Sequence, residues 1–212
     1  MNLWKKQLRA VPEEVWDQVE LETLVVADNF LTDISPRVGK LQRLRMLDLG
    51  HNALSSIPEE LGELKDLRDF LYLHDNKLRA LPQSIGNLKK LRYLNLSQNQ
   101  FTELPSVVLE LESLVELRVE DNQLSELPAR IWQLRSLQEL HLRNNQLTKL
   151  PEGTATLSKL RHLDLRGNPL TTLPDYLAAL PSLQKLDLRW VPSLQRPRWL
   201  KDLEARGVLI YL

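Results

Sequence analysis

The chain has 212 residues, carries 28 basic and 28 acidic side chains, and contains no cysteine. This balance argues against a nucleic-acid-binding protein, which normally shows a basic excess or stripe, and the lack of cysteine excludes a disulfide framework. No apolar run reaches the ~20 residues of a membrane span, and none follows the basic start of the chain, so we expect a cytoplasmic protein. Secretion without a readable signal stays open as the alternative.

An asparagine recurs at an almost constant interval of 23 residues, with one interval of 24: Asn29, Asn52, Asn76, Asn99, Asn122, Asn145 and Asn168. Each lies in the phrase L-x-x-L-x-L-x-x-N-x-L-x-x-L-P, seen from Leu91 to Pro105 with Phe101 in the place of its fourth leucine. A fixed period of this length indicates stacked units, none of which buries its apolar face alone. We therefore predict a single domain at 1–212, with an eroded first repeat at 1–20, regular repeats at 21–190 and a C-terminal cap at 191–212.

The eroded first repeat keeps the apolar positions of the phrase, such as Leu3 and Leu8, but has Lys6 in the asparagine position. In the regular repeats, Leu-x-Leu has the period of two that is typical of a strand. The asparagine that follows is expected to bond backbone groups of the turn. The Leu-Pro pair then ends the extended segment, and two aliphatic residues three apart, such as Ile85 and Leu88, predict a helical or 3₁₀ turn.

The C-terminal segment departs from the phrase, because Val191 takes the asparagine position. Residues 197–207 predict a short amphipathic helix, with proline near its start and glycine after its end. Residues 208–212 predict a last strand. We expect Trp199 and Leu203 to cover the apolar end of the stack.

The repeat, with its Leu-Pro pair and a frequent aliphatic-glycine pair such as Ile85-Gly86, resembles the leucine-rich repeat superfamily. Within it, the 23-residue phrase is similar to the intracellular Ras-group type, found in plant Ras-group repeat proteins, Ras suppressor, Scribble-type scaffolds and bacterial proteins. The resemblance covers essentially the whole chain. Departures at Pro36 and Thr154 affect only local convex geometry.

This resemblance implies an α/β solenoid, a right-handed horseshoe with a concave parallel β-sheet and short helical or 3₁₀ turns on the convex side. It also implies protein binding, in signal transduction or as a scaffold, and it permits a small GTPase or another signalling protein as the partner. Members of the superfamily bind unrelated partners, so the resemblance identifies none.

Residues between the strand leucines are expected to line the concave surface, where exposed aromatic residues are typical of interface hot spots. The N-terminal half of this surface is apolar and aromatic, the middle is acidic, and the C-terminal end mixes both charges. We predict an apolar anchor for a partner protein at Met46, Phe70, Tyr72, His74 and Tyr93. We predict polar partner contacts at Arg118, His141, Arg143, Arg166 and Arg189. The alternative is that the aromatic residues only support one another across strands.

Three of these arginines stack in one column and would suit an acidic peptide or a phosphate. Asp164 and Asp187, two residues before Arg166 and Arg189, favour a solvated charge network instead.

The third repeat has one extra residue, between Leu67 and Leu71. It predicts a bulge at the start of the strand, which would re-aim Asp69 or Phe70. A tolerated insertion without a function fits equally well.

The four histidines, His51, His74, His141 and His162, all fall at concave positions. His162 beside Glu139, or His51 beside Asp75, would supply two metal ligands, whereas zinc sites use three or four, and no H-E-x-x-H motif occurs. We therefore interpret the histidines as solvated variable residues and predict no catalytic residue, metal or cofactor.

Together these features predict a monomeric, non-catalytic module that binds a partner protein on its concave face. One alternative is a secreted bacterial effector or inhibitor that uses the same surface. The other is a metal-dependent hydrolase built on the concave histidines.

Overall fold

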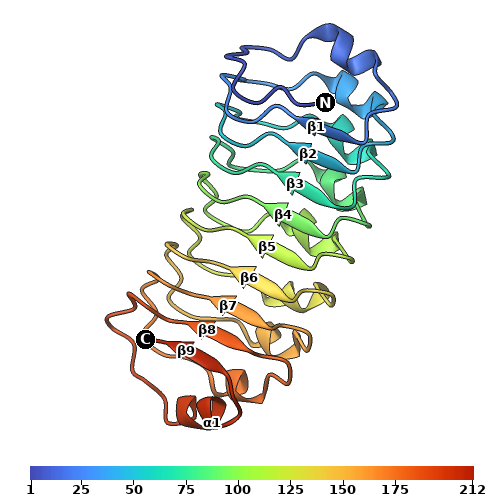
Figure 1. The fold of residues 1–212 in the computed structure, drawn as a ribbon. Helices are drawn as coiled ribbons and strands as arrows, with labels where there is room; N and C mark the ends of the chain where they lie inside the picture. The colour runs from blue at the N-terminus through green and yellow to red at the C-terminus, as the bar shows by residue number, and fades with distance from the viewer.

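The computed structural model describes residues 1–212, apart from the side chain of Ala155. Short parallel strands form one sheet in chain order, and 3₁₀ turns line the opposite side of a curved stack (Figure 1). The strands are β1 Thr23–Val25, β2 Met46–Asp48, β3 Phe70–Tyr72, β4 Tyr93–Asn95, β5 Glu116–Arg118, β6 Glu139–His141, β7 His162–Asp164, β8 Lys185–Asp187 and β9 Leu209–Tyr211. The 3₁₀ turns are η1 Glu13–Asp17, η2 Pro36–Lys40, η3 Glu59–Glu63, η4 Gln83–Asn87, η5 Ser106–Glu110, η6 Ala129–Gln133, η7 Glu152–Thr156 and η8 Asp175–Ala179. The predicted α/β solenoid, with a parallel sheet and short 3₁₀ turns, is confirmed.

The core is one continuous column of aliphatic side chains. The middle residue of every strand from β1 to β8 is a leucine, which pairs in register with the next, as Leu94 does with Leu117, and is fully buried. Burying each such side chain contributes about 1.5–3 kcal/mol. Across the described part of the chain, the backbone of each strand and turn approaches only the equivalent elements of adjacent repeats, apart from the terminal helix, which packs on β9 and η8.

The asparagines form a hydrogen-bonded ladder along one edge of the sheet. Asn99 accepts a hydrogen bond from the Leu78 N–H at 2.9 Å and donates to the carbonyls of Leu73, Leu96 and Ser97 at 2.9, 3.1 and 3.2 Å. All seven asparagines repeat this arrangement. The residue before each one has a positive φ, as Gln98 does at 55°, so the ladder fixes a left-handed turn that most side chains disfavour.

The convex turns stack closely because small residues occur where they touch. In η3, a Cβ added to Gly62 would lie 2.2 Å from the backbone oxygen of Ser84 in η4. Each turn except η2 begins after the proline of the aliphatic-Pro pair, which is Leu-Pro in most repeats, Val-Pro before η1 and Ile-Pro before η3. Where the proline comes one residue late, Ser35 caps η2 by accepting from the Arg37 N–H.

The two ends of the stack are closed in different ways. At the N-terminal end, Asn2 forms a parallel bridge with Val25, and Trp16 of η1 is fully buried. At the C-terminal end, helix α1, Leu200–Ala205, is shorter than the predicted 197–207 and buries Leu203, while β9 pairs with β8. Gly207, with φ at +86°, follows the helix. None of the helices in the described part of the chain has the length and apolar character that a membrane span requires.

Candidate functional site

The predicted apolar anchor forms a continuous aromatic cluster on β3 and β4, which we define as Phe70, Tyr72, His74 and Tyr93. The Phe70 ring stacks on Tyr72 with centroids 5.8 Å apart, and it meets Tyr93 edge-on at 5.4 Å. Tyr72 lies 5.0 Å from Tyr93 and 5.9 Å from His74. Phe70 is 40% exposed and the other three are half-buried, as is the neighbouring Met46. The cluster therefore combines mutual support across strands with a surface open to solvent.

The two tyrosine hydroxyls of this cluster stay protonated at neutral pH. Burial raises the pKa of Tyr93 to about 12, and burial also raises the pKa of Tyr72.

The extra residue of the third repeat produces the predicted bulge. Phe70 pairs with Met46 of β2, but it has no counterpart in β4, where pairing begins at Leu71 with Leu94. In a regular repeat two consecutive N–H groups donate to one carbonyl, as Val115 and Glu116 do to Arg92, whereas here the Arg68 carbonyl receives only the Arg92 N–H. The backbone of Phe70 therefore lies outside the pairing between β3 and β4.

Beside this bulge lies a hollow of about 240 Å³, lined by Asp69, Phe70, Arg92, Tyr93, Val115 and Glu116. Small-molecule sites typically measure about 300–1,000 Å³. The hollow is therefore better suited to one side chain of a larger partner than to a whole small ligand.

The acidic middle of the concave face is neutralised by arginines of the same surface. Arg118 Nε lies 2.6 Å from Glu116 Oε1, and Arg143 lies 2.9 Å from Asp121 and 3.7 Å from Glu120. Both arginines therefore hold carboxylates in place while exposing part of their guanidinium groups.

The C-terminal arginines are also paired, and the prediction that Asp164 and Asp187 neutralise them is confirmed. Arg166 Nε lies 2.9 Å from Asp164 Oδ1, and Arg189 Nη2 lies 2.7 Å from Asp187 Oδ2. Both aspartates are buried. The exposed Trp190 ring lies against these guanidinium groups, 6.0 Å from that of Arg166 and 5.7 Å from that of Arg189. This column therefore offers little unpaired positive charge to a phosphate.

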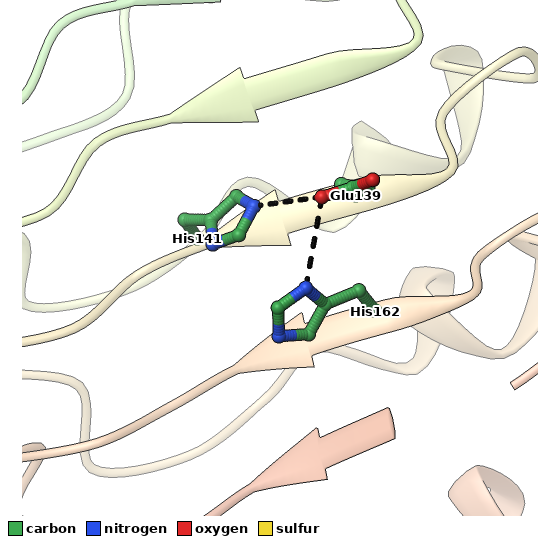
Figure 2. Close-up of side chains that lie close together, drawn as sticks. All are labelled: Glu139, His141 and His162. Carbon is green, nitrogen blue, oxygen red and sulfur yellow. Dashed lines mark hydrogen bonds and ion pairs between the residues drawn. The ribbon is translucent and has the colours of Figure 1, made fainter. Parts of the chain in front are cut away.

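The four histidines fall into two pairs, and each pair lies beside one of the acidic residues considered from the sequence, Asp75 and Glu139. The ring centroids of His51 and His74 are 4.7 Å apart, and His51 contacts Asp75. His141 and His162 are likewise 4.7 Å apart and both approach Glu139 (Figure 2).

The interpretation of the histidines as solvated residues is wrong for His141, which is 5% exposed. Longer side chains from β5 to β7 surround this ring, since Glu116, Glu139 and His162 all lie against it. Burial, assisted by the charge of Arg118, lowers the pKa of His141 to about 4, so its imidazole is neutral at physiological pH.

One candidate escaped the sequence prediction because it lies on the convex side. Trp132 of η6 is 39% exposed, and the Arg135 guanidinium lies 6.0 Å from its ring. It borders a hollow of about 540 Å³, which is also lined by Leu109 and Glu110 of η5. The signal was present, because Trp132 occupies the place that glycine takes after the aliphatic residue in repeats such as Ile85-Gly86.

Comparison with known proteins gives a consistent result along the chain. The family model described as Leucine rich repeat matches residues 19–78 and 135–190, and the model described as Leucine-rich repeat region matches 58–124.

Solved structures similar to the chain include a leucine-rich repeat protein of Leptospira interrogans, with 27% identity, a TM-score of 0.75, and coverage of 100% of this chain and 65% of that one. A second similar structure is the ectodomain of the plant membrane receptor kinase GASSHO1/SCHENGEN3 from Arabidopsis thaliana, in complex with CASPARIAN STRIP INTEGRITY FACTOR 2. It has 27% identity and a TM-score of 0.73, and the match covers 100% of this chain and 29% of that one. The PEPR1–AtPEP1 structure has 32% identity and a TM-score of 0.73, and the match covers 84% of this chain and 26% of that one. The chain thus spans less than two thirds of the length of these proteins.

Proposed function

Because the chain belongs to the leucine-rich repeat family, and because its concave sheet carries a half-exposed aromatic cluster beside a small hollow, we propose that it is a non-catalytic module that binds a partner protein or peptide. The partner lies across β2 to β5, and one of its apolar side chains enters the hollow between Phe70 and Val115.

The observation that carries this proposal is the bulge. It interrupts the pairing of β3 with β4 within the aromatic cluster, and Phe70 is 40% exposed at the rim of the hollow. Interface hot spots are typically aromatic side chains beside a pocket, surrounded by polar residues that exclude water. Here Glu116 and Arg118 provide that polar border.

Similar structures support a binding role, since the GASSHO1/SCHENGEN3 ectodomain and PEPR1 were each solved as complexes. The Ras-group resemblance of the repeats makes a small GTPase or another signalling protein the first class of partner to test. A bacterial effector or inhibitor would use the same surface, so the experiment below applies to it as well.

The test is partner capture followed by mass spectrometry, with the wild type and a Phe70→Ala, Tyr72→Ala, Tyr93→Ala variant. A second variant, Val115→Trp, fills the hollow and leaves the aromatic cluster intact. The matched control is Trp132→Ala, which removes an equally exposed aromatic side chain from the convex face.

We expect both concave variants to lose a partner that the control retains. Circular dichroism and thermal unfolding verify that each variant is folded, because the aromatic pairs contribute about 0.5–1.5 kcal/mol each and the triple variant is expected to be less stable. If the folded triple variant and Val115→Trp both capture the partner as the wild type does, the proposed surface is wrong.

A further inference from the structure

A cluster of three potential metal ligands lies on the concave face, away from the aromatic cluster. Glu139 and His141 come from β6, and His162 comes from β7 (Figure 2). One ligand atom from each residue lies within 4.8 Å of the others. Two histidines and one glutamate are a ligand set that zinc uses when one coordination position stays open. We propose that Glu139, His141 and His162 bind a divalent transition-metal ion, with Zn²⁺ as the first candidate.

The distances between the ligand atoms fit this ion. Zinc binds imidazole nitrogen at about 2.0–2.1 Å and carboxylate oxygen at about 2.0–2.2 Å, so two ligands of a tetrahedral site lie about 3.4 Å apart. Glu139 Oε2 lies 3.2 Å from His141 Nε2 and 3.6 Å from His162 Nδ1. A hydrogen bond accounts for the first distance, but the second is longer than an N–H···O bond normally allows. One carboxylate oxygen therefore already lies between two imidazole nitrogens at the spacing that an ion requires.

The tautomer of His141 changes when the ion binds. Without the ion, a ring proton on Nε2 accounts for the 3.2 Å contact with Glu139, whereas the ion requires this proton on Nδ1 instead. The rings meet at 79°, edge to face, rather than stacking in parallel.

The surroundings of His141 provide groups that would orient its ring. The imidazole also lies close to Glu120 and Asp164, which form a second group of three with it. Metal-bound histidines usually donate their other ring N–H to a carboxylate or a carbonyl, which holds the ring in place. Nearby cations, Arg118 and Lys185, oppose the charge of an incoming ion. The affinity for the metal ion must therefore come from the coordination geometry and not from a negative electrostatic potential around the site.

The test uses the full chain, freed of metal by a chelator and titrated with Zn²⁺ in a calorimeter. We expect one ion per chain and a thermal midpoint that rises with Zn²⁺, because the ion binds only the folded state. Co²⁺ added in place of Zn²⁺ is expected to give the intense visible absorption of a tetrahedral site.

Glu139→Gln and His162→Ala should each weaken binding at least about tenfold, since even changes outside the ligand set cost 10- to 100-fold. The matched control is His51→Ala, which removes a histidine from the other His–acid pair and should leave binding unchanged.

The proposal fails if the wild type binds no stoichiometric Zn²⁺, or if binding survives in both Glu139→Gln and His162→Ala. It also fails if His51→Ala abolishes binding. Loss in Glu120→Gln, together with retention in Glu139→Gln, would place the ion with the second group and overturn the ligand assignment. The aromatic variants above do not touch these residues, so partner binding and metal binding can fail independently.

Discussion

The asparagine ladder predicts that an Asn→Ala substitution lowers the unfolding free energy by different amounts in the middle and at the end of the array. Asn122→Ala, in the middle, removes the acceptor of the Phe101 N–H. It also removes donors to three carbonyls, but each of these keeps another partner. Leu96 still accepts from Asn99, Val119 from Asn145, and Glu120 from the Gln98 N–H. Only one buried polar group is therefore left without a hydrogen bond.

At the last rung, Asn168→Ala leaves two such groups. The Leu147 N–H loses its acceptor, and the Leu165 carbonyl loses the only donor it has among the described residues. The next repeat has Val191 in the asparagine position and supplies no replacement. An unsatisfied buried group costs about 1–3 kcal/mol. We therefore expect a loss of unfolding free energy of about 1–3 kcal/mol for Asn122→Ala and about 2–6 kcal/mol for Asn168→Ala.

Urea denaturation followed by far-ultraviolet circular dichroism measures both losses, and the summed fluorescence of the five tryptophans gives a second signal. Agreement of the two signals shows whether the array unfolds in one step, as the free-energy comparison requires. If Asn122→Ala costs as much as Asn168→Ala or more, the explanation by shared carbonyls is refuted.

Three further predictions concern packing and pH. Leu203→Ala should lower the unfolding free energy by about 2–5 kcal/mol in urea denaturation, because this side chain of the cap helix is fully buried. Gly62→Ala should cost about 1–3 kcal/mol in the same assay, more than Gly39→Ala, because only at Gly62 would the new Cβ meet the backbone of the next turn closer than 3.0 Å. Burial lowers the pKa of His74, so below the ordinary value of 6.5 the unfolded chain takes up a proton first and stability falls. His74→Gln should reduce this loss between pH 7.5 and about pH 5.5, and an unchanged pH profile would contradict it.

The repeat phrase predicts most of the fold because it states, residue by residue, which side chains must be buried. Strand leucines such as Leu94 and Leu117 allow only one register between neighbouring strands, because a shift by one residue would expose the buried leucines. The aromatic cluster was predictable for the same reason, because the positions between those leucines have to face outwards.

Burial on the concave face depends instead on the length of neighbouring side chains, which the period does not describe. His141 and Asn95 occupy equivalent positions in their strands, yet His141 is covered by Glu116, Glu139 and His162 from three strands. The hollow beside Phe70 is likewise lined by three consecutive repeats, through residues such as Asp69, Arg92 and Val115. To predict such features, one must know how the side chains of three neighbouring repeats are placed relative to one another.

Because backbone contacts link each repeat only to its neighbours, the number of repeats in this protein can change without a change in the fold. A whole 23-residue unit inserted between two regular repeats would pack on both sides against the same kinds of residues as any other regular unit. These are the strand leucines, the asparagine and the convex turn of its neighbours. Duplication of a unit would lengthen the recognition surface by one strand, about 4.8 Å, without a redesign of the core. A site confined to two neighbouring strands, as the Glu139, His141 and His162 cluster is, could be copied along with its units. The binding surface can therefore evolve by changes in copy number as well as by point substitution.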